Sequence, residues 1–226
     1  MFYIKHIIAI ILCFVGFNLF SQSDIESLGE SSFAVNKKVS SDYNYNFSVR
    51  SRYYLYQDDA INFENRQLDF VHFSTLNLDY SHSLSLGIQY RLRKNIDGGS
   101  NELRLTQQFN FAVKKEAIRF GHRFRFEQRI LDALTIFRSR YRFAIDFALV
   151  GQKLDVGESY LVASLEALYS ASAKIKPEID QRTTVQIGWL ISEQLKLQFG
   201  LEYRFEAFNI HTEERLFILT SAILKI

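Results

Sequence analysis

The sequence predicts an all-β fold: an antiparallel up-and-down transmembrane β-barrel of 10–12 strands with a charge-filled lumen. Alternating apolar and polar segments run for about 10–13 residues, which suits a tilted transmembrane strand and exceeds the five or six residues of soluble sheets. Their connections alternate between short and long, as periplasmic turns and extracellular loops do. The chain also ends inside a strand, where Leu216, Ile218, Leu224 and Ile226 share one face. Together these features favour a membrane barrel over a soluble exported β-protein.

Residues 1–21 predict a secretory signal peptide. Lys5 gives a positive start, residues 7–19 form an apolar run, and a polar segment follows. That run is shorter than the roughly 20 residues that a membrane-spanning helix needs, so we expect cleavage and a single barrel domain over residues 22–226. Cleavage removes Cys13, the only cysteine, and the exported fold would then have no disulfide. No second apolar run has spanning length, which excludes a helical membrane protein.

Alternation marks eleven segments as strands. They are 33–39, 43–55, 68–80, 84–94, 101–113, 118–129, 137–147, 158–169, 180–190, 195–206 and 215–226. A single-chain bacterial barrel closes with an even number of strands. We therefore expect ten strands if 33–39 is not a full strand. Twelve are expected if a short extra strand precedes it, within what otherwise reads as a polar lead over 23–32.

The stretch 119–146 has the clearest alternation of the chain. Phe124 and Phe126 fall on one face of a β-hairpin, while Arg123 and Arg125 fall on the other. In a membrane barrel the aromatic face contacts lipid and the arginines point inward. The predicted lumen charge network is Arg123, Arg125, Glu127, Arg129, Arg138, Arg140, Arg142, Glu166, Asp180, Arg182, Glu202 and Arg204.

Trial strand registers place carboxylates beside arginines in this network. The expected cross-strand neighbours are Glu127–Arg138, Arg125–Arg140, Glu166–Arg140, Glu166–Arg182, Arg182–Glu202 and Asp180–Arg204. Glu166 is the most enclosed of them, because arginine flanks it on both sides.

Two readings of the network stay open. In the first, paired charges fill a narrow lumen and satisfy one another. In the second, the lumen is a polar pathway or an anion-binding space, since an excess of arginine attracts anions. The formal net charge is only +2, and the charges alternate along strands. A nucleic-acid partner is therefore not expected, because it requires clustered basic residues on one surface.

Catalytic signals are weak. His72, Ser74, His122 and Gln128 interrupt the outward apolar faces, and one trial register sets Ser51 opposite His72. Nucleophilic catalysis also needs an orienting third group and an oxyanion site, and neither is identifiable. No metal-ligand or phosphate-loop signature appears, so no cofactor or metal is expected.

Five segments in this order resemble a known family. They are HRFRFEQRI (122–130), FRSRYRFAIDFAL (137–149), YLVASLEALY (160–169), EIDQRTTVQIGW (178–189) and LKLQFGLEYRFE (195–206). The arginine-rich hairpin, the Glu-bearing strand and the Asp-Gln-Arg strand resemble domain of unknown function 2490, a family of exported proteins common in Bacteroidota. That family usually opens with a Trp-containing strand, where this chain has Phe33. The resemblance implies an outer-membrane β-barrel without an assigned activity.

The expectation is a monomeric barrel in the outer membrane of a Gram-negative bacterium, with a structural role or a role in passing anions or other small solutes. Its expected partners are outer-membrane lipid, lipopolysaccharide and the outer-membrane assembly machinery. We do not expect an enzyme. The alternatives are an outer-membrane lipid-acting hydrolase and a barrel whose loops bind or adhere.

Overall fold

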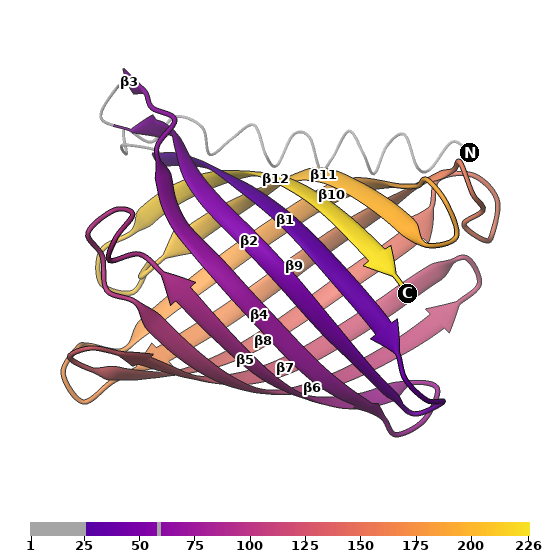
Figure 1. The fold of residues 1–226 in the computed structure, drawn as a ribbon, viewed down its shortest axis with the longest axis horizontal. Coiled ribbons are helices and arrows are strands. Elements are labelled where there is room, and N and C mark those ends of the chain that lie inside the picture. The colour runs from indigo at the N-terminus through magenta and orange to yellow at the C-terminus, as the bar shows by residue number, and fades with distance from the viewer. Residues whose placement is uncertain (1–25, 58–59) are drawn as a thin grey trace.

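The alternating segments of the sequence are strands that close into one barrel (Figure 1). The computed structural model describes residues 26–57 and 60–226. Aromatic and β-branched residues on one face of most segments favour extended backbone, because they pack well on a pleated surface. The strands are β1 (Glu26–Lys38), β2 (Tyr43–Gln57), β3 (Ala60–Ile61), β4 (Asn65–Asn77), β5 (His82–Leu92), β6 (Glu102–Lys115), β7 (Ile118–Leu131), β8 (Thr135–Ala148), β9 (Ser159–Ala171), β10 (Glu178–Leu190), β11 (Leu195–Glu206) and β12 (Glu213–Lys225).

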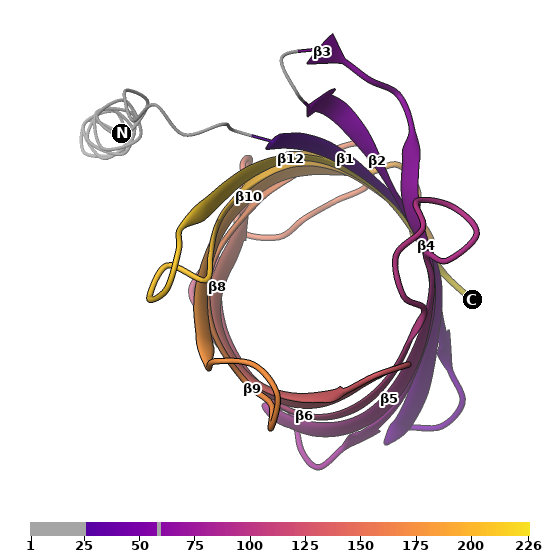
Figure 2. The same cartoon turned by 90° about the vertical axis from the view of Figure 1, so that its left-hand side faces the viewer.

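Eleven of the described strands form the ring, and β3 is a two-residue extension paired only with β2. Figure 2 shows the closed ring with β3 standing away from it. When an up-and-down ring has an odd number of strands, its first and last strands run in the same direction. β1 and β12 accordingly pair in parallel, with Glu26 opposite Arg215 and Asn36 opposite Lys225. The predicted barrel is confirmed, but both even counts are wrong, and one seam departs from the antiparallel pattern.

The predicted polar lead over 23–32 is wrong from Glu26 onward, where β1 begins. This half of the strand lacks an apolar ladder because the face opposite Leu28 and Glu30 carries Ser27, Gly29 and Ser31. On the inward face, Leu28 is fully buried and Glu30 pairs with arginines. The predicted signal peptide, residues 1–21, lies outside the described residues. In the described part of the chain, no helix is long and apolar enough to cross a bilayer.

Short connections gather at one end of the barrel and longer ones at the other, as the sequence indicated (Figure 1). The connections at the C-terminal end of the barrel are 39–42, 78–81, 116–117, 149–158 and 191–194. Those at the opposite end are 58–64, 93–101, 132–134, 172–177 and 207–212. Two connections depart from the rule, the long 149–158 and the short 132–134.

Polar residues dominate the buried interior. Within the described residues, six hydrophobic side chains are buried against sixteen polar or charged ones. Large apolar residues instead cover the outside, where Phe124 and Leu201 remain about half exposed. A soluble sheet protein buries its apolar face, so this inverted arrangement is that of a barrel that holds its polar groups inside.

Candidate functional site: the arginine-lined lumen

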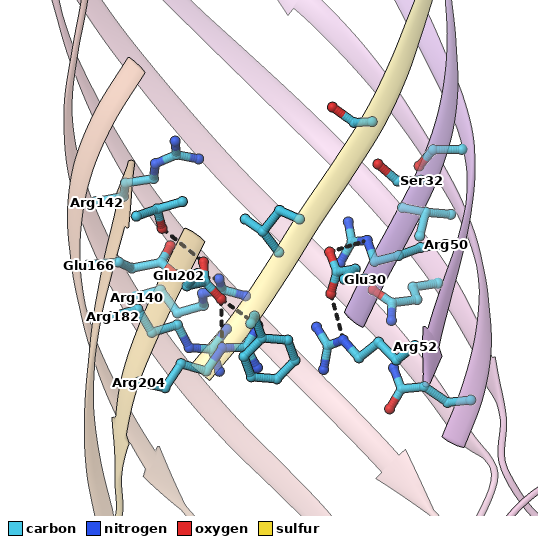
Figure 3. A pocket seen from close by; sticks show the side chains of 18 of the residues that line it. Glu30, Ser32, Arg50, Arg52, Arg140, Arg142, Glu166, Arg182, Glu202 and Arg204 are labelled. Atoms are coloured by element: carbon cyan, nitrogen blue, oxygen red, sulfur yellow. Dashed lines mark hydrogen bonds and ion pairs between the residues drawn. The ribbon is translucent and has the colours of Figure 1, made fainter. Parts of the chain in front are cut away.

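The barrel encloses a cavity of about 670 Å³ that is rich in charged side chains. Among the described residues its lining has fifteen arginines and seven carboxylates. The lining arginines are Arg50, Arg52, Arg66, Arg91, Arg93, Arg104, Arg123, Arg125, Arg129, Arg138, Arg140, Arg142, Arg182, Arg204 and Arg215. The lining carboxylates are Glu30, Glu166, Glu178, Asp180, Glu202, Glu206 and Glu213. Figure 3 shows charged side chains of opposite walls extending into the space between them.

Eleven of the twelve lumen residues predicted from the sequence line this cavity. They are Arg123, Arg125, Arg129, Arg138, Arg140, Arg142, Glu166, Asp180, Arg182, Glu202 and Arg204. The twelfth, Glu127, is fully buried and contacts lining arginines. Period-two alternation brings them together, because each strand turns every second side chain inward.

One side of the lumen carries more arginines than carboxylates, and we call it the basic wall. It comprises the inward charged residues of β6 to β10 at the cavity. Its members are Arg104, Arg123, Arg125, Arg129, Arg138, Arg140, Arg142, Arg182, Glu102, Glu127, Glu166, Glu178 and Asp180. Eight arginines thus face five carboxylates.

Glu127 is the shared carboxylate in the fully buried part of the basic wall. Its Oε1 lies 3.1 Å from Arg140 Nη1, 3.5 Å from Arg125 Nη1 and 3.6 Å from Arg104 Nη1. Burying a carboxylate is costly unless it is paired, and here three guanidinium groups compensate the charge of Glu127. This part of the wall is a packed ionic network.

Glu166 anchors the part of the basic wall that borders the open cavity. Arg140 Nη2 donates to its Oε2 at 2.5 Å, and Arg123 Nη2 donates to its Oε1 at 3.0 Å. Arg142 on β8 and Arg182 on β10 are its direct backbone neighbours in the sheet. Four arginines therefore surround one carboxylate.

The opposite side of the lumen has equal numbers of each sign, and we call it the balanced wall. It is formed by β11, β12, β1 and β2, with Arg66 from the start of β4; the Arg91–Asp69 ion pair on β5 and β4 lies between the two walls and adds one charge of each sign. Its charged members are Arg50, Arg52, Arg66, Arg204, Arg215, Glu26, Glu30, Glu202, Glu206 and Glu213. These five arginines and five carboxylates form two sets of ion pairs, a small one around Glu30 and a larger one around Arg215 and Arg204, and the Phe217 ring lies against an arginine of each set.

Close contacts hold the balanced wall together. Glu30 lies 2.5 Å from Arg52 Nε and 3.2 Å from Arg50 Nε, and Arg204 Nη2 lies 2.5 Å from Glu202 Oε1. The Arg204 guanidinium also stacks 3.7 Å from the centroid of the buried Phe217 ring. A guanidinium over an aromatic face is favourable, so this wall is internally compensated.

The predicted network contains only Glu202 and Arg204 of the balanced wall, and it lacks Arg104, Glu102 and Glu178 of the basic wall. Arg50 and Arg52 do alternate with apolar residues in the sequence, so the same signal that found the hairpin could have found them. Glu30 and Glu26 were overlooked because their strand has no complete apolar face. Arg215 begins the last predicted strand, but its contact with Glu26 joins the two ends of the chain and could not be read from alternation.

Arg93 lines the cavity but adds no surplus charge, because Asp97 in the loop 93–101 pairs with it. Burial raises the pKa of Asp97, but hydrogen bonds from Arg93 and from the Gly99 N–H outweigh it. They hold that pKa below the ordinary aspartate value of 3.8. The turn places Gly98 at φ 77°, a conformation that favours glycine.

Some predicted registers are right and others are shifted by two residues. Glu127 lies opposite Arg138, Arg125 opposite Arg140, and Glu166 opposite Arg182, as predicted. In the sheet, however, the backbone neighbour of Glu166 on β8 is Arg142, and that of Arg182 on β11 is Arg204.

The two shifts have local causes. The ten-residue connection 149–158 separates β8 from β9, and a long connection leaves register undetermined by the turn. Between β10 and β11, Ile191 N donates to Leu195 O and centres the turn on Glu193. Glu202 therefore faces Thr184, and the predicted neighbours Arg182–Glu202 and Asp180–Arg204 are wrong.

The trial pairing of Ser51 with His72 is also wrong. Ser51 lies opposite Leu68, and His72 lies opposite Phe47, whose ring centroid is 4.3 Å away. The His72 Nε2 atom is 3.1 Å from Ser74 Oγ. Within the described residues, no group of three or more His, Cys, Asp or Glu could hold a metal ion.

Comparisons with known proteins place the chain in a family. Among solved structures, it is similar to an anion-selective porin from Comamonas acidovorans, with 12% identity and a TM-score of 0.36. That match covers 76% of this chain and 54% of the porin, so the chain spans about half the porin's length. No curated protein matches the chain. The family model described as protein of unknown function DUF2490 matches residues 31–214, and the chain therefore belongs to this family, as its motifs predicted.

Proposed function

We propose that the protein is a monomeric outer-membrane β-barrel whose lumen admits and passes small anions. It would lie in the outer membrane of a Gram-negative bacterium after signal-dependent export, with lipid and lipopolysaccharide around it and the assembly machinery as its insertion partner. The proposal requires an outer surface that tolerates lipid and an interior that favours negative charge.

The outer surface supports the first requirement. Phe124, Phe137, Leu165, Val185 and Leu201 lie on five successive strands, and each side chain is exposed to between 44% and 51%. The ring strands are 11 to 15 residues long, enough to cross the hydrocarbon core while tilted. Apolar side chains exposed around a whole ring cost free energy in water but not in a bilayer.

The observation that carries the anion proposal is the composition of the cavity lining. Fifteen lining arginines face seven lining carboxylates. Buried carboxylates such as Asp69, Glu102 and Glu127 offset part of the difference. The remaining excess lies on the basic wall. A pore lined by an excess of arginine attracts anions and repels cations.

Strand number supports a usable lumen. Eight-stranded barrels are filled by their side chains, whereas barrels of 16 to 18 strands leave a wide aqueous channel. Eleven strands fall between these limits, and a cavity of about 670 Å³ remains among the side chains. Such a lumen suits single small ions better than large solutes.

Single-channel recording tests the proposal. The full chain, folded into a planar lipid bilayer across a tenfold KCl gradient, should show current steps. The reversal potential should have the sign expected of a channel that passes Cl⁻ more readily than K⁺. Insertion is verified separately by protease protection in vesicles of the same lipid. Inserted protein that gives no current, or a reversal potential of the cation-preferring sign, would overturn the proposal.

A further inference from the structure

The positive charge around Glu166 exceeds the negative charge. Glu166 is buried, and it hydrogen-bonds only to Arg140 and Arg123 among the described residues. Arg142 and Arg182 flank it in the sheet but make no hydrogen bond to it. Arg140 is shared with Glu127, so the remaining positive charge gathers on Arg123, Arg142 and Arg182.

These three arginines have donors without acceptors. The Nε atoms of Arg123, Arg142 and Arg182 are buried and, within the described residues, have no hydrogen-bond partner; Arg140 Nε is in the same state, but its two Nη atoms pair with carboxylates. In the same part of the chain Arg142 makes no ion pair either, and the one carboxylate contact of Arg182 is Glu206 at 3.7 Å. Buried polar groups normally have hydrogen-bond partners, and leaving a charged donor without an acceptor is costly. The carboxylates of this part of the wall therefore do not satisfy its arginines.

The strand register adds to the strain. Arg123 lies directly opposite Arg142, and Arg182 lies directly opposite Arg204. Like charges at opposed cross-strand positions are destabilising. One carboxylate cannot neutralise three further guanidinium groups, whereas an additional anion in the adjoining cavity would do so. All four of these arginines and Glu166 line that cavity.

We propose that Arg123, Arg142 and Arg182 form a binding site for a small phosphate-class oxyanion beside Glu166. This inference rests on the proposed function in one respect, that anions reach the lumen. Guanidinium groups present planar forks of N–H donors that match the paired oxygens of an oxyanion. Chloride has no such pair of oxygens and would bind there only by charge.

Glu166 makes the site better suited to phosphate than to sulfate. Each carboxylate oxygen has two acceptor positions, and each Glu166 oxygen accepts one hydrogen bond from an arginine. Phosphate at neutral pH keeps at least one O–H, which can donate to the remaining position. Sulfate has no proton to donate and would set its lone pairs against those of Glu166.

Calorimetry on the full chain, folded in detergent, tests this site with sodium phosphate, sodium sulfate and sodium chloride at matched ionic strength. Phosphate should bind saturably. Sulfate should bind about tenfold more weakly, or more, because it cannot donate the charge-assisted hydrogen bond and sets its oxygens against the free lone pairs of Glu166. Chloride should produce no saturable heat.

Variants distinguish this site from general attraction to the lumen. Arg142→Gln should weaken phosphate binding about tenfold or more by removing a charged donor. Its matched control is Arg50→Gln, which removes an equal charge from the balanced wall and should leave binding within about twofold. Glu166→Gln should remove most of the discrimination against sulfate. If Glu166→Gln does not fold, the comparison of phosphate with sulfate in the wild type tests the discrimination, and Arg182→Gln tests the site a second time with the same expected loss of phosphate binding as Arg142→Gln.

Three results would overturn the inference: no saturable phosphate binding, equal binding of phosphate and sulfate, or equal losses for Arg142→Gln and Arg50→Gln. Its failure is separable from that of the proposed function. Saturable phosphate binding by a barrel that carries no current would support the binding site and rule out conduction through the lumen. Chloride-preferring current without phosphate binding would support conduction and rule out the binding site.

Discussion

The basic wall and the balanced wall are built from the same strand alternation, yet they satisfy their charges differently. In the balanced wall, Glu30 takes two arginines and Arg204 rests on Phe217 and two carboxylates. In the basic wall, Arg142 has no carboxylate partner among the described residues, and Glu166 is surrounded by four arginines. Filling a barrel with charge therefore does not require a surplus, because one wall achieves it with equal numbers. The surplus on the other wall calls for a separate explanation, and an anionic ligand or permeant ion provides one.

Removing Glu127 should have the largest effect on stability. Glu127→Ala leaves three guanidinium groups inside the barrel without their shared carboxylate. Breaking a buried ionic network by deleting one partner costs about 3–5 kcal/mol of unfolding free energy. Urea titration of the lipid-folded barrel measures this, with fluorescence of Trp189, the single tryptophan, as the signal.

The control for this variant is Glu213→Ala. Glu213 also pairs with an arginine, Arg215, but its side chain is 52% exposed, so the loss should stay within about 1 kcal/mol. Equal losses for the two variants would contradict the view of Glu127 as the anchor of a buried network.

Removing Glu30 should cost less than removing Glu127. Glu30→Gln deprives Arg52 and Arg50 of their carboxylate, but the Arg50 side chain is 33% exposed and Arg52 lies over the Phe217 ring. We expect a loss of about 1–3 kcal/mol, the cost of leaving buried donors partly unsatisfied. Ser32→Ala, two residues along the same inward face, is the matched control and should change stability by about 0.5 kcal/mol or less. A Glu30→Gln loss as large as that of Glu127→Ala would remove the distinction between the walls.

The loop pair of Arg93 and Asp97 should give the smallest effect, and it depends on pH. Because the folded-state pKa of Asp97 is lowered, its stabilising contribution is present above the unfolded value of 3.8. It is lost as the pH falls through the lower folded pKa. The difference in melting temperature between wild type and Asp97→Asn should therefore be largest above pH 5 and should shrink below pH 3. A difference that grows on acidification would contradict this sign.

The sequence predicted the barrel and most of the basic wall, because both depend on period-two alternation within each strand. Glu127 opposite Arg138 was predictable since the connection 132–134 is tight and fixes the hairpin register. The long connection 149–158 left the position of Arg142 beside Glu166 undetermined. Alternation also could not reveal the parallel seam, because the relation of β1 to β12 depends on how the whole ring closes.

The surplus around Glu166 was only partly visible in the sequence. An excess of arginine in the hairpin could be counted, but which arginine lacks a partner depends on side-chain geometry across three strands. Arg140 has two carboxylate contacts while its neighbour Arg142, on the same face of β8, has none within the described part of the chain. No property of the two residues in the sequence separates them.

The most direct test of the account compares the reversal potentials of wild type, Arg142→Gln and Arg50→Gln across the same KCl gradient. Each variant removes one positive charge from the lumen: Arg142→Gln removes it from the basic wall, and Arg50→Gln removes it from the balanced wall. The account predicts an anion-preferring wild type, a clear loss of that preference in Arg142→Gln and near-retention in Arg50→Gln. Equal shifts in the two variants, or no anion preference in wild type, would contradict the claim that the basic wall gives the lumen its preference for anions.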